Sequence, residues 1–128
     1  MNMRPGPIDV HAHWLPRDLF GLAPGSPVPP LADRDGQLHL GELPLSIETD
    51  AMSDIERVLA DTDTAGLGAR VLSAPPFAFP VVDHPEVDSF VGAYNQELEK
   101  VCRDSGGRLL GLGLVSLHQP ESARKQIG

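Results

Sequence analysis

Two histidines near the start of the chain are the residues whose type and spacing most directly indicate chemistry. His11 and His13 end the segment from Ile8 to His13, in which apolar and polar side chains alternate. This period of two is typical of a β-strand with one apolar and one functional face. Side chains two residues apart project to the same side of a strand, so the two imidazoles can bind one metal ion. The alternative is an exposed or merely hydrogen-bonded pair.

The elements expected around this pair place it at a ligand-binding edge. Apolar runs that predict strands alternate with segments of helical periodicity. Strands are expected at 8–13, 70–73 and 109–115. Helices are expected to begin at Ser53, within Asp83 to Glu86, and at Pro120. Such alternation predicts right-handed βαβ units in an α/β fold with a parallel sheet. Ligands bind at the carboxyl ends of the strands in these folds, and the two histidines lie at such an end.

Local signals predict where these elements begin and end. Ser53 to Glu56 has the pattern of a capping box, with Ser53 as the N-cap and Glu56 reaching back, and Gly66 or Gly68 ends that helix. The segment 109–115 is apolar on both faces apart from its glycines, as in parallel sheets covered by helices. Residues 21–50 are rich in proline and glycine and predict a long loop, with a small hairpin about Asp35-Gly36 as one possibility.

Composition excludes several classes of function. The net charge of -8 argues against nucleic acid as the main partner, because phosphate binding requires a surplus of Lys and Arg. No apolar run approaches the length of a membrane span, and the first residues lack the apolar stretch of a signal peptide. Cys102 is the only cysteine, so an intrachain disulfide is excluded. These features predict a cytoplasmic protein with neither nucleic acid nor a membrane as its partner.

The first strand resembles a known signature. Ile8-Asp9-Val10-His11-Ala12-His13, followed by Leu15-Pro16, looks like the first strand of the amidohydrolase superfamily, and is most similar to the branch that contains 2-amino-3-carboxymuconate 6-semialdehyde decarboxylase and related non-oxidative decarboxylases. The likeness continues along the chain. Met52 to Gly66 resembles the first helix of that branch, and Val71 to Pro76 its second strand. Tyr94-Asn95-Gln96-Glu97-Leu98 resembles the middle of its second helix, Arg108 to Gly113 its third strand, and Gln119-Pro120-Glu121 the turn into its third helix.

The resemblance implies a fold, a cofactor and a partial site. Members of the superfamily are TIM-type (β/α)₈ barrels that usually hold one divalent ion, commonly zinc, and His11 and His13 would be two of its ligands. The remaining ligands and the acid/base residue have no counterpart here. A barrel of this type needs about 250 residues, so residues 1–128 are expected to form its N-terminal portion, about three βα units. Alone it is expected to be inactive and to need a missing C-terminal part or a homo-oligomer.

Other residues have a functional and a structural interpretation. Asp9 could orient a ligand imidazole or bond to backbone near the strand, and Trp14 could line the pocket or pack in the core. Phe77 and Phe79 follow the second strand and could contact substrate. A structural or solvated role is favoured for the remaining candidates, which are His39, His84, His118 and Cys102.

Two functions follow from these observations. The first is a metal-dependent hydrolase or non-oxidative decarboxylase that acts on a small carboxylic acid, in which the ion polarises a substrate oxygen or lowers the pKa of a water. Decarboxylases of this branch carry an arginine before the first helix, and the segment 43–52 has none; the nearest are Arg34 and Arg57. The alternative is a non-catalytic barrel remnant that binds metal or a partner chain as an oligomer. A nucleotide-binding or redox domain is disfavoured, because the glycine-rich and Cys-x-x-Cys motifs are lacking.

Overall fold

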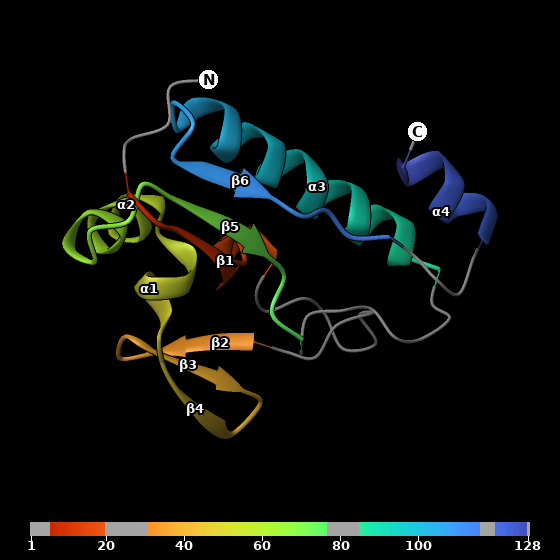
Figure 1. Ribbon diagram of the computed structural model, residues 1–128. Coiled ribbons are helices and arrows are strands. Elements are labelled where there is room, and N and C mark those ends of the chain that lie inside the picture. The colour runs from red at the N-terminus through yellow and green to blue at the C-terminus, as the bar shows by residue number, and fades with distance from the viewer. Residues whose placement is uncertain (1–5, 20–30, 77–84, 116–119, 128) are drawn as a thin grey trace.

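The computed structural model in Figure 1 describes residues 6–19, 31–76, 85–115 and 120–127. In this part of the chain a parallel sheet and an antiparallel sheet are accompanied by helices, which gives a mixed α/β fold. The strands of the parallel sheet are β1 (Ile8–His13), β5 (Ala69–Ser73) and β6 (Leu109–Gly111). They lie in the order β1-β5-β6, so the order of the strands in the sheet is their order along the chain. The predicted alternation of parallel strands and helices is confirmed for these elements.

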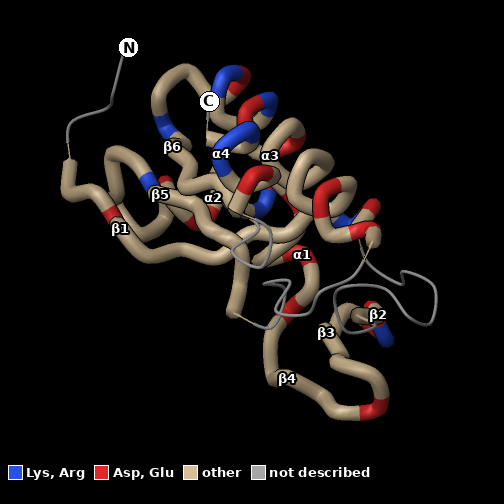
Figure 2. The backbone as a smooth tube through the Cα atoms, turned by 90° about the vertical axis from the view of Figure 1, so that its right-hand side faces the viewer, with Lys and Arg blue, Asp and Glu red and all other residues tan. Residues whose placement is uncertain are grey.

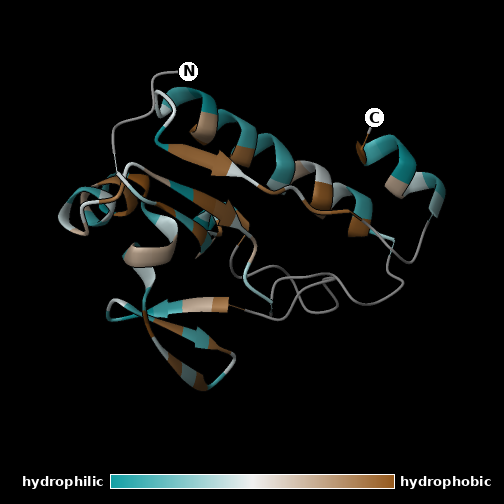
Figure 3. Ribbon diagram, viewed as in Figure 1, coloured by the Kyte–Doolittle hydropathy of each residue, from teal (hydrophilic) through white to brown (hydrophobic). Residues whose placement is uncertain are grey.

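The hydrophobic core joins the parallel sheet to its two long helices, α2 (Ile55–Thr64) and α3 (Val87–Asp104). Leu72 and Leu109 from the sheet are buried in one cluster with Val58 of α2 and with apolar residues of α3. The predicted apolar positions of α3 supply most of its contribution, namely Val87, Val91, Tyr94 and Leu98. Figure 3 shows β6 as hydrophobic and much of α3 as hydrophilic, and Figure 2 shows charged residues of both signs along α3. An amphipathic helix that covers a sheet has this distribution.

The helix after the first strand begins differently from the prediction. Thr49–Ser53 form a short helix, α1, and Asp54 rather than Ser53 is the N-cap of α2. Asp54 has an extended backbone, and its carboxylate accepts a hydrogen bond from the backbone N–H of Glu56 at 3.2 Å. The predicted cap at Ser53 is therefore wrong by one residue, because aspartate caps as well as serine does and the preceding turn is already helical. The predicted stop is confirmed at Gly66, which has a φ of 72°.

Most of the predicted loop at 21–50 is instead a three-stranded antiparallel sheet. Its strands are β2 (Leu31–Arg34), β3 (Gln37–Leu40) and β4 (Leu43–Glu48), and residues 20–30 lie outside the described part of the chain. The hairpin at Asp35-Gly36 is confirmed, since both residues have positive φ as a type I′ turn requires. The loop prediction is wrong for 31–48. The proline in this segment, Pro44, does not exclude a strand, because β4 is at an edge of the sheet, where a missing N–H is tolerated.

The third parallel strand is shorter than predicted. β6 ends at Gly111, whereas the apolar pattern predicts a strand to Val115. The side chain of Asn95 on α3 bonds to both backbone groups of Leu114: Nδ2 donates to the carbonyl oxygen at 2.9 Å, and Oδ1 accepts from the N–H at 2.8 Å. These groups are thus bonded to a helix side chain rather than to a neighbouring strand. The last described helix, α4 (Pro120–Ile127), begins at Pro120 as predicted.

The close approach of β6 to α3 predicts opposite effects for one substitution at two glycines. A Cβ at Gly111 would lie 2.7 Å from Leu98 Cγ, and Leu98 is buried and cannot yield easily. We expect Gly111→Ala to destabilise the chain by about 1–3 kcal/mol. Gly92 lies inside α3 with nothing within 4 Å of its Cβ position, so Gly92→Ala should stabilise by about 0.5–1 kcal/mol. Urea unfolding followed by circular dichroism measures both; equal effects would contradict the packing described.

Candidate metal site

The structure brings the two histidines of β1 together at the carboxyl end of the strand. Their ring centroids are 4.7 Å apart and the ring planes are nearly perpendicular, at 87°. Two nitrogens that bind one zinc at tetrahedral angles lie roughly 3.3 Å apart, because each Zn–N distance is about 2.0–2.1 Å. The centroid separation is compatible with that requirement. The pair therefore has the proximity that the His-x-His spacing predicts.

Burial distinguishes the two histidines and the two nitrogens of one of them. His11 is exposed, whereas His13 is half-buried. The Nδ1 atom of His13 is enclosed and has no hydrogen-bond partner among the described residues. An external ligand would therefore reach His13 through Nε2. In metal sites the nitrogen that does not bind the ion usually donates its N–H to a carboxylate or a carbonyl, a bond that His13 Nδ1 lacks among the described residues.

Asp9 is held by the backbone of β1. Asp9 pairs with Arg70 and Ala12 pairs with Leu72, so β1 contains one residue more than β5 between these pairs. This β-bulge interrupts the alternation of side chains between Asp9 and Ala12, a stretch that includes His11. Its carboxylate accepts a hydrogen bond from the N–H of His11 at 3.0 Å and lies 3.8 Å from Arg70 Nε. Of the two predicted roles, the structure shows the backbone bond.

The chain is fixed by hydrogen bonds as it leaves β1. The N–H of Trp14 donates to the carbonyl of Ser73 at 2.8 Å, and the hydroxyl of Tyr94 donates to the carbonyl of Trp14 at 3.1 Å. The Trp14 side chain is 2% exposed and its ring lies 6.0 Å from that of Tyr94. Trp14 is therefore a core residue, the second of its two predicted roles. Burial, and to a smaller extent an electrostatic effect of Cys102, raises the pKa of Tyr94, so its hydroxyl stays a donor.

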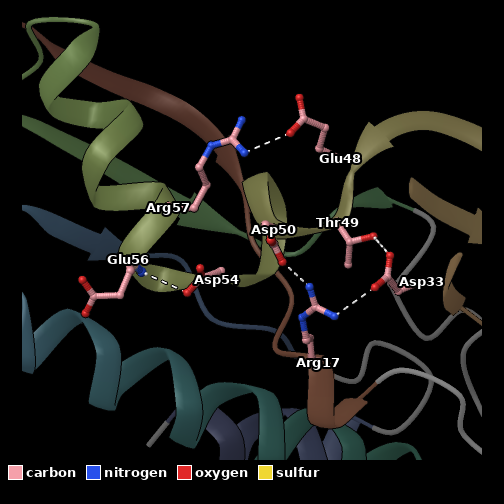
Figure 4. Close-up of polar contacts among 8 residues, drawn as sticks. All are labelled: Arg17, Asp33, Glu48, Thr49, Asp50, Asp54, Glu56 and Arg57. Atoms are coloured by element: carbon pink, nitrogen blue, oxygen red, sulfur yellow. Dashed lines mark hydrogen bonds and ion pairs between the residues drawn. The ribbon is translucent and has the colours of Figure 1, made fainter. Parts of the chain in front are cut away.

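An arginine four residues beyond the histidine pair links this exit to the antiparallel sheet (Figure 4). Arg17, in the short helix Arg17–Leu19, donates to Asp33 Oδ2 at 3.2 Å and is also bonded to Asp50 of α1. Thr49 Oγ1 donates to the other oxygen of Asp33 at 2.7 Å. The Thr49 hydrogen bond, together with Arg17, lowers the pKa of Asp33. The sequence gives no local signal for these contacts, because the partners are 16 or more residues apart.

The arginines nearest to the segment 43–52 are engaged with carboxylates. Arg34, the last residue of β2, bonds to Glu42 in the turn between β3 and β4, and Arg57 bonds to Glu48 and Asp61. Glu48, and then Asp61, raise the pKa of Arg57. Both arginines therefore have intramolecular partners.

The other candidate residues do not join the histidine pair in the described part of the chain. There, no cluster contains three or more His, Cys, Asp or Glu side chains that could share an ion. His39 lies on β3, where its Nδ1 is 3.1 Å from the carbonyl oxygen of Gln37. Cys102 is half-buried beside the core, and burial raises the pKa of its thiol. The remaining four candidates lie outside the described residues: Phe77, Phe79, His84 and His118.

No protein-family model matches the chain, and no curated protein matches it. Within the described residues, every helix is too short or too polar to cross a bilayer.

Proposed function

We propose that His11 and His13 hold a divalent metal ion, zinc by preference, in an enzyme of the amidohydrolase type. The observation that carries the proposal is the pair itself: two imidazoles with centroids 4.7 Å apart at the carboxyl end of the first parallel strand. Imidazole nitrogens are preferred zinc ligands, and this end of a parallel sheet is where such folds bind ligands. The donor types therefore fit the ion. Zinc takes four ligands in most sites, so the proposal requires further ligands besides these two.

The arrangement of the parallel strands supports the same family. β1, β5 and β6 are neighbours in chain order and parallel, as the first strands of a (β/α)₈ barrel are. In such a barrel α2 and α3 would belong to the outer ring, and the histidines of β1 would lie at the mouth. We propose this barrel as the parent architecture, with the antiparallel sheet of β2 to β4 inserted between its first strand and first helix.

The proposed reaction is hydrolysis or non-oxidative decarboxylation of a small carboxylic acid. The ion would act as a Lewis acid toward a substrate oxygen. The role of this chain is to orient its two imidazoles: the enclosed Nδ1 of His13 leaves Nε2 for the ion, and the Asp9 bond to the His11 N–H fixes the bulged backbone. The lack of an arginine in 43–52 favours a substrate other than the muconate semialdehyde, and the nearest arginines, Arg34 and Arg57, already bond to carboxylates.

Zinc-dependent stability tests the proposal on the chain itself. A ligand that binds only the folded state stabilises it by about 2.7 kcal/mol when its free concentration is 100 times Kd. We expect the urea midpoint to rise with zinc. Above Kd the rise should become linear in the logarithm of the free zinc concentration, as binding at one site predicts. The midpoint should return to its starting value when EDTA is added. Magnesium at the same concentration is the control, since imidazole is a poor ligand for it. A midpoint that zinc leaves unchanged would refute the proposed site.

A further inference from the structure

The two peptide groups that follow His13 are bonded to three different elements. The N–H of Trp14 bonds to Ser73 at the end of β5, and the N–H of Leu15 bonds to Met52 of α1 at 3.4 Å. The carbonyl of Trp14 receives the hydroxyl of Tyr94, which comes from α3 and lies 80 residues further along the chain. The backbone directly after the histidine pair is thereby fixed from the sheet, from α1 and from α3.

We infer that Tyr94 is a positioning residue for the His11 and His13 pair, an inference that rests on the proposed function for its metal readout. Among the three bonds just described, the Tyr94 hydroxyl is the one contributed by a side chain. Its ring is fully buried and packs against Trp14 at a centroid distance of 6.0 Å. The ring fixes where α3 lies against the exit of β1, and the hydroxyl fixes the rotation of the peptide there.

This bond matters because a metal site requires precise orientation of its ligands. Ligand side chains must lie within roughly 0.5 Å and 10–20° of the productive geometry, and the groups that hold them supply that accuracy. His13 is one residue from the peptide that Tyr94 binds, and its ring in turn contacts that of His11 edge-on. Removal of a group that orients metal ligands typically weakens binding about 10- to 100-fold. We expect an effect at the lower end, about tenfold, because the two backbone bonds remain.

The test compares two variants that each lose one buried hydroxyl. Tyr94→Phe keeps the ring and removes the bond to Trp14. Thr62→Val is the matched control: Thr62 is also fully buried, and its Oγ1 donates to the carbonyl of Val58 at 2.6 Å, within α2. Each change is expected to lower the free energy of unfolding by about 1 kcal/mol, so a purely structural role would give the two variants the same phenotype.

Two readouts separate positioning from stability. The first is the affinity for Zn²⁺ by titration, which Tyr94→Phe should lower about tenfold and Thr62→Val should leave at the wild-type value. The second is the nuclear Overhauser effect between the His11 and His13 rings without metal, which should weaken in Tyr94→Phe alone. If Tyr94→Phe retains this ring contact and the wild-type affinity, the inference is wrong. If the wild-type chain binds no zinc, the proposed function fails, and the ring contact alone then decides the role of Tyr94.

Discussion

Trp14→Ala should lower the free energy of unfolding by about 3–5 kcal/mol, the range for removal of a large buried side chain. Trp14 is 2% exposed and belongs to the core cluster that includes Leu72 of β5, Met52 of α1 and Tyr94 of α3. The substitution therefore leaves a cavity where the exit of β1 meets all three of these elements. Native domains are stable by only about 5–15 kcal/mol, so this variant should lose a large share of its stability and unfold at a much lower urea concentration than the wild type.

Urea unfolding followed by far-ultraviolet circular dichroism is the appropriate measurement, because Trp14 is the only tryptophan and its loss removes the fluorescence probe. Leu43→Ala is a control for loss of an apolar side chain, since Leu43 is 59% exposed on the edge strand β4. Its effect should stay within about 0.5 kcal/mol, as is usual for surface positions. If both variants unfolded at the same urea concentration, Trp14 would not be the core residue described.

The sequence predicts the parallel sheet because its signals are local. The alternation in 8–13, the apolar runs that became β5 and β6, and the glycine stop after α2 each act within a few residues. The sequence does not predict the antiparallel sheet, because the composition of its segment is that of a loop. Prolines and glycines in 21–50 indicate a loop, but Pro44 is accommodated on an edge strand and Gly36 belongs to the hairpin turn. Counting such residues does not reveal which of them lie at turns and edges.

The same distinction holds for the candidate metal site, where some features depend on neighbouring residues and others on residues far apart in the sequence. The His-x-His spacing is local, and it predicts the proximity that the two rings have in the structure. The bulge beside Asp9 depends on pairing with β5, and the bonds from Tyr94 to Trp14 and from Arg17 to Asp33 join residues far apart in sequence. No periodicity or motif encodes such pairs, because each depends on how the elements pack against one another. The supporting contacts could therefore be found only in the structure.

A double variant, His11→Ala/His13→Ala, is expected to lose zinc binding completely. Each imidazole supplies one nitrogen ligand, and no cluster of three or more potential ligands exists in the described part of the chain to replace them. Stability should change little, since His11 is exposed and His13 is only half-buried. His39→Ala is the matched control: it removes an imidazole that lies on β3 beside the Gln37 carbonyl rather than on β1. That variant should bind zinc as the wild type does.

The most direct test of the central claim is the zinc content of the three purified proteins, measured by elemental analysis after equilibrium dialysis against the same free zinc concentration. The proposed site predicts about one ion per chain in the wild type and in His39→Ala, and none above the buffer level in the double variant. Equal zinc in all three proteins would contradict the claim, because the ion would then be bound elsewhere. Zinc at the buffer level in all three would contradict it equally, since the paired imidazoles would then hold no metal.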